Sequence, residues 1–105
     1  MNINQDYLIK FNLLVIEFAG KSFEEYLNLY ENEDSFVEEY FIDKKKLILR
    51  VSVLELEKDE EENEYLHISI SMFDESNNYS SAKYSAGFFY YKESGIDEIF
   101  INLKY

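Results

Sequence analysis

His67 is the only histidine of this 105-residue chain, which also contains no cysteine. A histidine acts as a general base only when other groups hold it within hydrogen-bond reach of its substrate. A serine–histidine–acid arrangement is conceivable, but the sequence has neither a nucleophile elbow nor a glycine-rich oxyanion loop. As a metal ligand, His67 has no companion histidine or cysteine. We therefore interpret His67 as a structural residue and expect no enzyme activity.

Carboxylates are the second group that could do chemistry, because they are the oxygen ligands that Mg²⁺ and Ca²⁺ prefer. The run 59–64 lacks the glycine and the alternating ligand positions of an EF-hand, and the segment 74–78 is equally well explained as a turn. The run favours weak divalent association over a specific metal site. Without a glycine-rich phosphate loop, nucleotide binding has no support either, and we expect no cofactor.

Net charge points instead to a macromolecular partner. Asp and Glu number 22 against 10 Lys and Arg, which gives a formal net charge of -12. Such a field repels nucleic acid, whose binding depends on neutralisation of phosphates by Lys and Arg. The same field attracts basic proteins and speeds their association. The alternative interpretation is a charge that serves solubility alone.

Ten tyrosines support the partner hypothesis, because tyrosine is enriched in protein interfaces. We expect Tyr26, Tyr30, Tyr40 and Tyr84 to serve the core, whereas Tyr65, Tyr79, Tyr91 and Tyr105 lie beside polar residues and are available to a partner. Tyrosine beside carboxylate suits arginine and lysine. The predicted partner-binding residues are therefore acids and tyrosines of the second half of the chain: Glu55, Glu57, Asp59, Glu60, Glu61, Glu62, Glu64, Tyr65, Asp74, Glu75, Tyr79 and Tyr91.

Helices are predicted first along the chain. The segment 7–18 matches both a helical stripe and a strand, and its length and the following Gly20 favour a helix. Two segments, 22–25 and 35–38, have Ser followed three residues later by Glu, the pattern of a capping box. They predict a helix that begins at Ser22 and a shorter helix from Ser35 through Phe41 or Ile42.

Strands are predicted in the rest of the chain. The segments 47–57 and 65–73 form one hairpin around the acidic run 58–64, and 84–92 with 96–105 form a second. Helices followed by strands indicate a single α+β domain over residues 1–105, with the N-terminal helices packed on one face of a four-stranded antiparallel sheet. The opposite face is expected to expose aromatic residues of the strand 84–92.

The N-terminal residues lack the features of an export signal, and no apolar stretch reaches the length of a membrane span, so we expect a cytoplasmic protein. In size, acidity and absence of cysteine, the chain resembles the small cytoplasmic immunity proteins of bacterial toxin systems. This resemblance transfers no residue roles. It implies a non-enzymatic inhibitor that neutralises a basic, nuclease-type toxin by capping its active-site cleft.

Two alternatives remain open. One is a phage-encoded nucleic-acid mimic that inhibits a restriction or CRISPR effector, which requires carboxylates spaced like phosphates. The other is a small structural subunit or homodimeric binding module whose aromatic sheet face pairs with a copy of itself. We expect a monomer or a weak homodimer.

Overall fold

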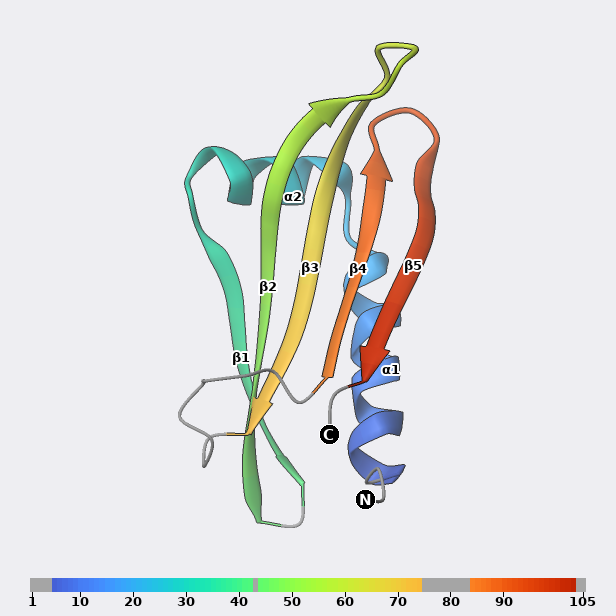
Figure 1. Ribbon diagram of the computed structural model, residues 1–105. Helices are drawn as coiled ribbons and strands as arrows, with labels where there is room; N and C mark the ends of the chain where they lie inside the picture. Colours follow the sequence, from blue (N-terminus) through green and yellow to red (C-terminus); the bar gives the residue numbers. More distant parts are fainter. Residues whose placement is uncertain (1–4, 43, 75–83, 104–105) are drawn as a thin grey trace.

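Two helices and a five-stranded antiparallel sheet make up the computed structural model, which describes residues 5–42, 44–74 and 84–103 (Figure 1). Neighbouring strands in the sheet follow the order of the chain. The α+β class and the antiparallel sheet are as predicted, but the sheet has five strands instead of four. In chain order the elements are α1 (Gln5–Ala19), α2 (Phe23–Glu31), β1 (Ser35–Ile42), β2 (Lys45–Lys58), β3 (Glu64–Asp74), β4 (Tyr84–Tyr91) and β5 (Gly95–Leu103).

The extra strand is β1, so the helix predicted from the 35–38 pattern is wrong. β1 pairs antiparallel with β2 along its whole length. Ser35 does not cap a helix, because its Oγ lies 2.9 Å from the Oγ of Ser52 on the neighbouring strand. The capping-box pattern is local, and pairing with β2 overrides it.

Side-chain burial explains why β1 is a strand. Phe36 and Tyr40 pack against the core, whereas Val37 and Phe41 between and beyond them are exposed. This two-residue alternation belongs to a strand, and β-branched and aromatic side chains fit its half-buried surface well. In a helix, Val37 and Phe41 would lie on a face directly beside that of Phe36 and Tyr40. In a strand the two pairs lie on opposite faces, which matches their burial and exposure.

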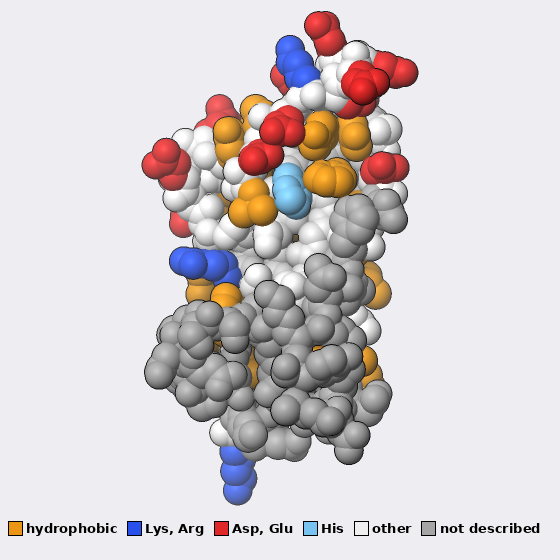
Figure 2. Space-filling model, viewed as in Figure 1, with side chains coloured by type: hydrophobic (Ala, Val, Ile, Leu, Met, Phe, Trp, Pro, Cys, Tyr) orange, Lys and Arg blue, Asp and Glu red, His pale blue; other side chains and the backbone are white. Residues whose placement is uncertain are grey.

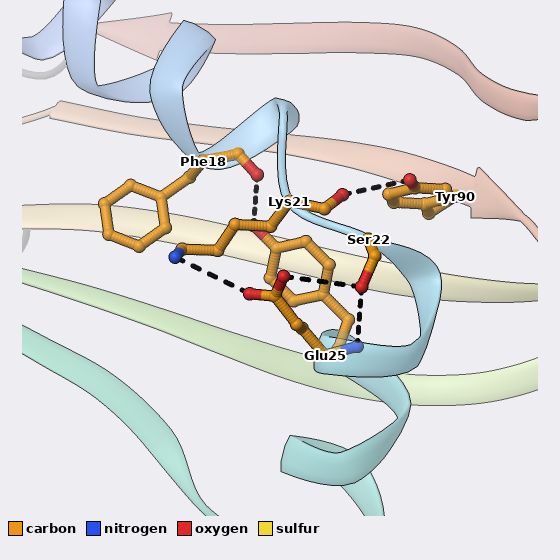
Figure 3. Close-up of polar contacts among 6 residues, drawn as sticks. Phe18, Lys21, Ser22, Glu25 and Tyr90 are labelled. Carbon is orange, nitrogen blue, oxygen red and sulfur yellow. Dashed lines mark hydrogen bonds and ion pairs between the residues drawn. The ribbon is translucent and has the colours of Figure 1, made fainter.

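The capping box at Ser22 is confirmed (Figure 3). The amide of Glu25 donates to Ser22 Oγ at 3.2 Å, and the Ser22 hydroxyl donates to the Glu25 carboxylate at 3.4 Å. At the other end of α2, Glu33 adopts a left-handed conformation with φ 52°, and the amide of Asp34 donates back to the carbonyl of Leu29 at 2.9 Å. This Schellman-type ending turns the chain directly into β1.

Both helices cover the same face of the sheet, and Figure 1 shows them behind it. No described helix has the length and apolarity needed to cross a membrane. The opposite, open face of the sheet carries no helix in the described residues. The core lies between the helices and the central strands, and its buried members are Phe11, Leu14, Val15, Phe18, Phe23, Tyr26, Leu29, Leu47, Leu49, Val51, Leu66, Ile68, Ile70, Met72, Tyr84, Ala86 and Phe88.

Tyr26 joins both helices to the sheet. Its ring packs against Phe36, Phe88 and Tyr90, with ring centroids 6.1 Å apart in each pair. Its hydroxyl donates to the carbonyl of Phe18 in the last turn of α1 (Figure 3). Burial raises the pKa of Tyr26 well above its usual range, so the phenol stays neutral and remains a donor.

We predict that Tyr26→Phe lowers the free energy of unfolding by about 0.5–1.5 kcal/mol, because it keeps the ring but removes one of the two hydrogen bonds to the Phe18 carbonyl, which also accepts from the Lys21 amide at 3.3 Å. Urea denaturation followed by circular dichroism measures this difference. Tyr30→Phe is the matched control, since Tyr30 lies on the same helix and is exposed. Equal stability of the two variants would contradict a structural role for the Tyr26 hydroxyl.

Candidate protein-binding surface

A bulge in β2 decides which face carries its acids. Val51 and Val53 pack on the core side, and unbroken alternation would send Glu55 and Glu57 to the same side. The pairing register of β2 with β3 shifts between Val53 and Glu55. Leu54 is the extra residue of this bulge, and its side chain is exposed. The alternation is thereby reset, and Glu55 and Glu57 lie on the open face.

Directly across from these acids lies a group of rings that we call the aromatic ladder: Tyr65, His67, Phe89 and Tyr91. Glu55 on β2 pairs with His67 on β3, and Glu57 pairs with Tyr65. On the next strand, β4, Phe89 pairs with His67 and Tyr91 pairs with Tyr65. The centroid of the Tyr65 ring lies 5.0 Å from that of Tyr91 and 5.5 Å from that of Phe89. The centroids of the His67 and Phe89 rings lie 4.9 Å apart.

The ladder reaches the molecular surface. All four side chains are partly exposed. Figure 2, viewed from the open face, shows the histidine among hydrophobic side chains, with acidic side chains beside and above them. A Cβ added at Gly87 on β4 would lie 3.2 Å from the carbonyl oxygen of Ile68, which is a tight approach to β3, and 3.7 Å from His67 Nε2, which is an ordinary contact. His67 is therefore part of a packed ring cluster.

Hydrogen bonds join Glu57 to the Tyr65 hydroxyl and to the neighbouring Glu55. The Tyr65 hydroxyl donates to Glu57 Oε2 at 2.9 Å, and this hydrogen bond raises the pKa of Tyr65. Hydrogen bonding to Glu57, together with repulsion from its charge, also raises the pKa of Glu55. Glu55 therefore holds a proton more readily than an isolated glutamate, and a cation placed near the two acids would relieve their repulsion.

The loop between β2 and β3 is ordered by Asp59. Asp59 Oδ1 accepts from the amides of Glu61 and Asn63, both at 2.9 Å, and the amide of Glu62 donates to the Asp59 carbonyl at 3.0 Å. The backbone bond from Asn63 is the largest cause of the lowered pKa of Asp59. These bonds close the acidic run into a compact turn despite the repulsion among its charges. Asp59 thus has a structural role that the neighbouring glutamates lack.

The remaining acids of the loop, Glu60, Glu61 and Glu62, are exposed at the far end of the first hairpin. We call them the acidic tip. Between this loop and the β4–β5 turn lies a polar depression of about 330 Å³. Lysine and glutamate side chains line it together, and Lys92 Nζ lies 3.9 Å from Glu64. Glu64 is therefore partly neutralised. Glu62 of the acidic tip also lines the depression, whereas Glu60 and Glu61 do not.

Other predicted residues fare differently. Glu75 and Tyr79 lie outside the described residues, as does Tyr105, and Asp74 is the last residue of β3. Tyr30 was assigned to the core, but it is exposed on α2. Phe89 and His67 belong to the surface cluster although the predicted set omitted them. The alternation of residues 84–92 was the signal that could have added Phe89.

Chemistry other than binding has little geometric support in the described part of the chain. No three described acids and histidines are grouped so as to hold a metal ion. A second depression, about 410 Å³ in volume, is lined by described residues Val37, Glu39, Ile48, Arg50 and Phe73. Neither His67 nor Glu55 lines either depression. These two groups sit on an open sheet surface, where water competes for any substrate.

Comparison with known proteins adds no further assignment, because no protein-family model, curated protein or solved structure matches this chain. The surface chemistry therefore carries the functional argument.

We predict that Glu57→Gln lowers the pKa of Glu55 toward the ordinary value of a glutamate, because the neighbouring charge is removed. The raised pKa of Glu55 stabilises the fold only at acidic pH, and this contribution is lost as the pH rises through that pKa. The melting temperature of Glu57→Gln at pH 7 should therefore equal or exceed that of the parent. NMR titration of the side-chain carboxyls measures the pKa. Glu93→Gln, in the β4–β5 turn, carries the same charge change as a control and should leave Glu55 unaltered.

Proposed function

We propose that this chain is a non-enzymatic inhibitor that binds a basic protein through the acidic tip, Glu55, Glu57 and the aromatic ladder. In its specific form the proposal is a cytoplasmic immunity protein that neutralises a nuclease-type bacterial toxin by capping its active-site cleft. The observation that carries it is the contact of partly exposed rings with exposed carboxylates on a sheet face that no described helix covers.

Each part of this surface suits a basic cleft. The rings of Tyr65 and Tyr91 offer flat area on which an arginine guanidinium can stack. Glu55 and Glu57 stand beside those rings and can accept charge-assisted hydrogen bonds from the same arginine or a neighbouring lysine. The acidic tip projects beyond them at the end of the hairpin, where it can reach into a concave site. A nuclease needs a basic cleft for its substrate, and these groups can fill it first.

The test uses the protein encoded beside the gene for this chain, in two forms. The form with an intact active site serves the toxicity and nuclease assays, and a form with its predicted catalytic residue replaced serves the binding measurements. The proposal expects that this neighbour is toxic when expressed alone with an intact site, and that co-expression of the chain restores growth. In vitro, nuclease activity should fall to zero at one chain per toxin. A neighbour that is harmless, or a toxin that the chain leaves fully active, would refute the proposed inhibition.

Association with the inactivated toxin should be salt-sensitive. We predict that the association rate constant falls at least about tenfold between 0.01 M and 1 M salt, because the Debye length falls from about 30 Å to about 3 Å. Stopped-flow fluorescence measures it. A rate that stays flat over this range would remove electrostatic steering from the account.

The acidic tip can be tested with Asp59 left in place, since Asp59 orders the loop. We predict that Glu60→Gln, Glu61→Gln and Glu62→Gln together slow association at low salt by about tenfold and keep or raise the melting temperature, because crowded like charges repel one another. The matched control replaces Glu24, Glu31 and Glu33 of the α2 region with Gln, which changes the net charge equally. Equal slowing in both triple variants would assign the effect to overall charge rather than to the tip.

A further inference from the structure

One helix of this protein is apolar on nearly every side. The inner face of α1 is buried in the core, yet three large aliphatic side chains point the opposite way, with Ile9 56% exposed, Leu13 59% and Ile16 67%. We call these three residues the α1 stripe. A helix that is hydrophobic all round is normally covered on all sides, and charged residues normally occupy the solvent face. The α1 stripe is therefore a candidate contact surface.

Spacing along α1 fits a second helix. Ile9, Leu13 and Ile16 are four and three residues apart, which is the alternation of a coiled-coil seam. If two such helices run antiparallel about a two-fold axis near Leu13, then Leu13 meets Leu13 of the other copy and Ile9 meets Ile16. The stripe is thus complementary to itself, as a two-fold contact requires.

Charges beside the stripe are complementary in the same arrangement. Lys10 and Glu17 are seven residues apart, so they lie on the same flank of α1. Lys10 Nζ sits 4.7 Å from the centre of the Tyr40 ring, which places this flank toward β1. In an antiparallel pair related by a two-fold axis, the flank of α1 that carries Lys10 and Glu17 faces the same flank of the other copy, which runs in the opposite direction. Lys10 of one copy then faces Glu17 of the other, and each pair occurs twice.

Repulsion between two chains of net charge -12 is also smaller in this arrangement than in pairing through the open face of the sheet. The described molecule is 45 Å long, and α1 lies behind the sheet while the acidic tip lies at one end (Figure 1). Antiparallel helices send the two acidic tips to opposite ends, separated by far more than the Debye length of about 8 Å at physiological salt. Pairing through the open face would instead bring Glu55 and Glu57 of both copies together.

We propose that the α1 stripe is the contact between two copies of this chain, which pair with their α1 helices antiparallel about a two-fold axis near Leu13. α1 has 15 residues and is about 22 Å long, so a single helix pair buries less than the ~800 Å² per partner of a standard interface. The dimer is accordingly weak and forms at micromolar or higher concentration. The tip and the aromatic ladder stay free in it.

Sedimentation equilibrium over a wide range of protein concentration tests the pairing. The weight-average mass of the parent should rise from 12.6 kDa toward twice that value. Leu13→Glu should keep the mass at the monomer value, because two carboxylates would meet at the axis. Leu54→Glu is the matched control, since Leu54 on β2 is exposed to a similar degree, and it should dimerise like the parent. Thermal melts confirm that each variant is folded.

Charge reversal tests the antiparallel order. Lys10→Glu or Glu17→Lys alone turns two attractive pairs into repulsive ones and should weaken the dimer about tenfold. The double variant restores opposite charges and should recover the parent's dissociation constant. Thermal melts of Lys10→Glu control for the lost contact with Tyr40.

Three results would overturn the proposal. The first is a parent chain that remains monomeric at millimolar concentration, and the second is a Leu13→Glu variant that dimerises as well as the parent. A monomer that binds phosphatidylcholine vesicles, and loses this binding in Leu13→Glu, would assign the stripe to a lipid surface instead. Recovery in the double charge variant, with loss of dimer in Leu13→Glu, would establish the arrangement.

Discussion

The packing of Tyr26 is the interaction on which the rest of the structure depends. Its ring contacts side chains from β1 and β4, and its hydroxyl closes the last turn of α1 while its backbone belongs to α2. A second tyrosine, Tyr90, donates to the Lys21 carbonyl at 2.9 Å and fixes the connection between the helices (Figure 3). Because these bonds hold both helices to one face, the other face of the sheet carries no helix among the described residues.

A sheet face that no described helix covers is either polar or available for recognition, and here polar and aromatic side chains occupy different parts of it. Ser69, Ser71 and Ser85 make the centre of the face polar along β3 and β4, whereas the aromatic ladder and its acids gather toward the first hairpin's loop. Rings in contact with one another keep part of their apolar surface from water. The area that remains exposed is rimmed by carboxylates, which in the proposed function select for a cationic partner.

The two proposed contacts use opposite sides of the molecule and different physics. Recognition of a basic protein depends on charge and on flat rings, so it is sensitive to salt. Pairing through the α1 stripe depends mainly on aliphatic burial, which salt does not screen, and the Lys10–Glu17 pairs add a smaller salt-sensitive part. Since the first lies on the open face and the second on the outer side of α1, one can form without blocking the other. A dimer would then present two acidic tips to two partners.

The sequence by itself determined the α+β class, the helix after Ser22 and the two hairpins, because caps, alternation and turns are local patterns that need no distant partner to be read. It also indicated the acidic hairpin loop and aromatic residues on the outer face. Only the tertiary structure decided that 35–42 is a strand, since the neighbouring strand β2 supplies the hydrogen bonds that a local serine cap cannot match. It alone placed Glu55 and Glu57 on the open face, because one extra residue, Leu54, inverts the alternation at a bulge that no sequence pattern marks.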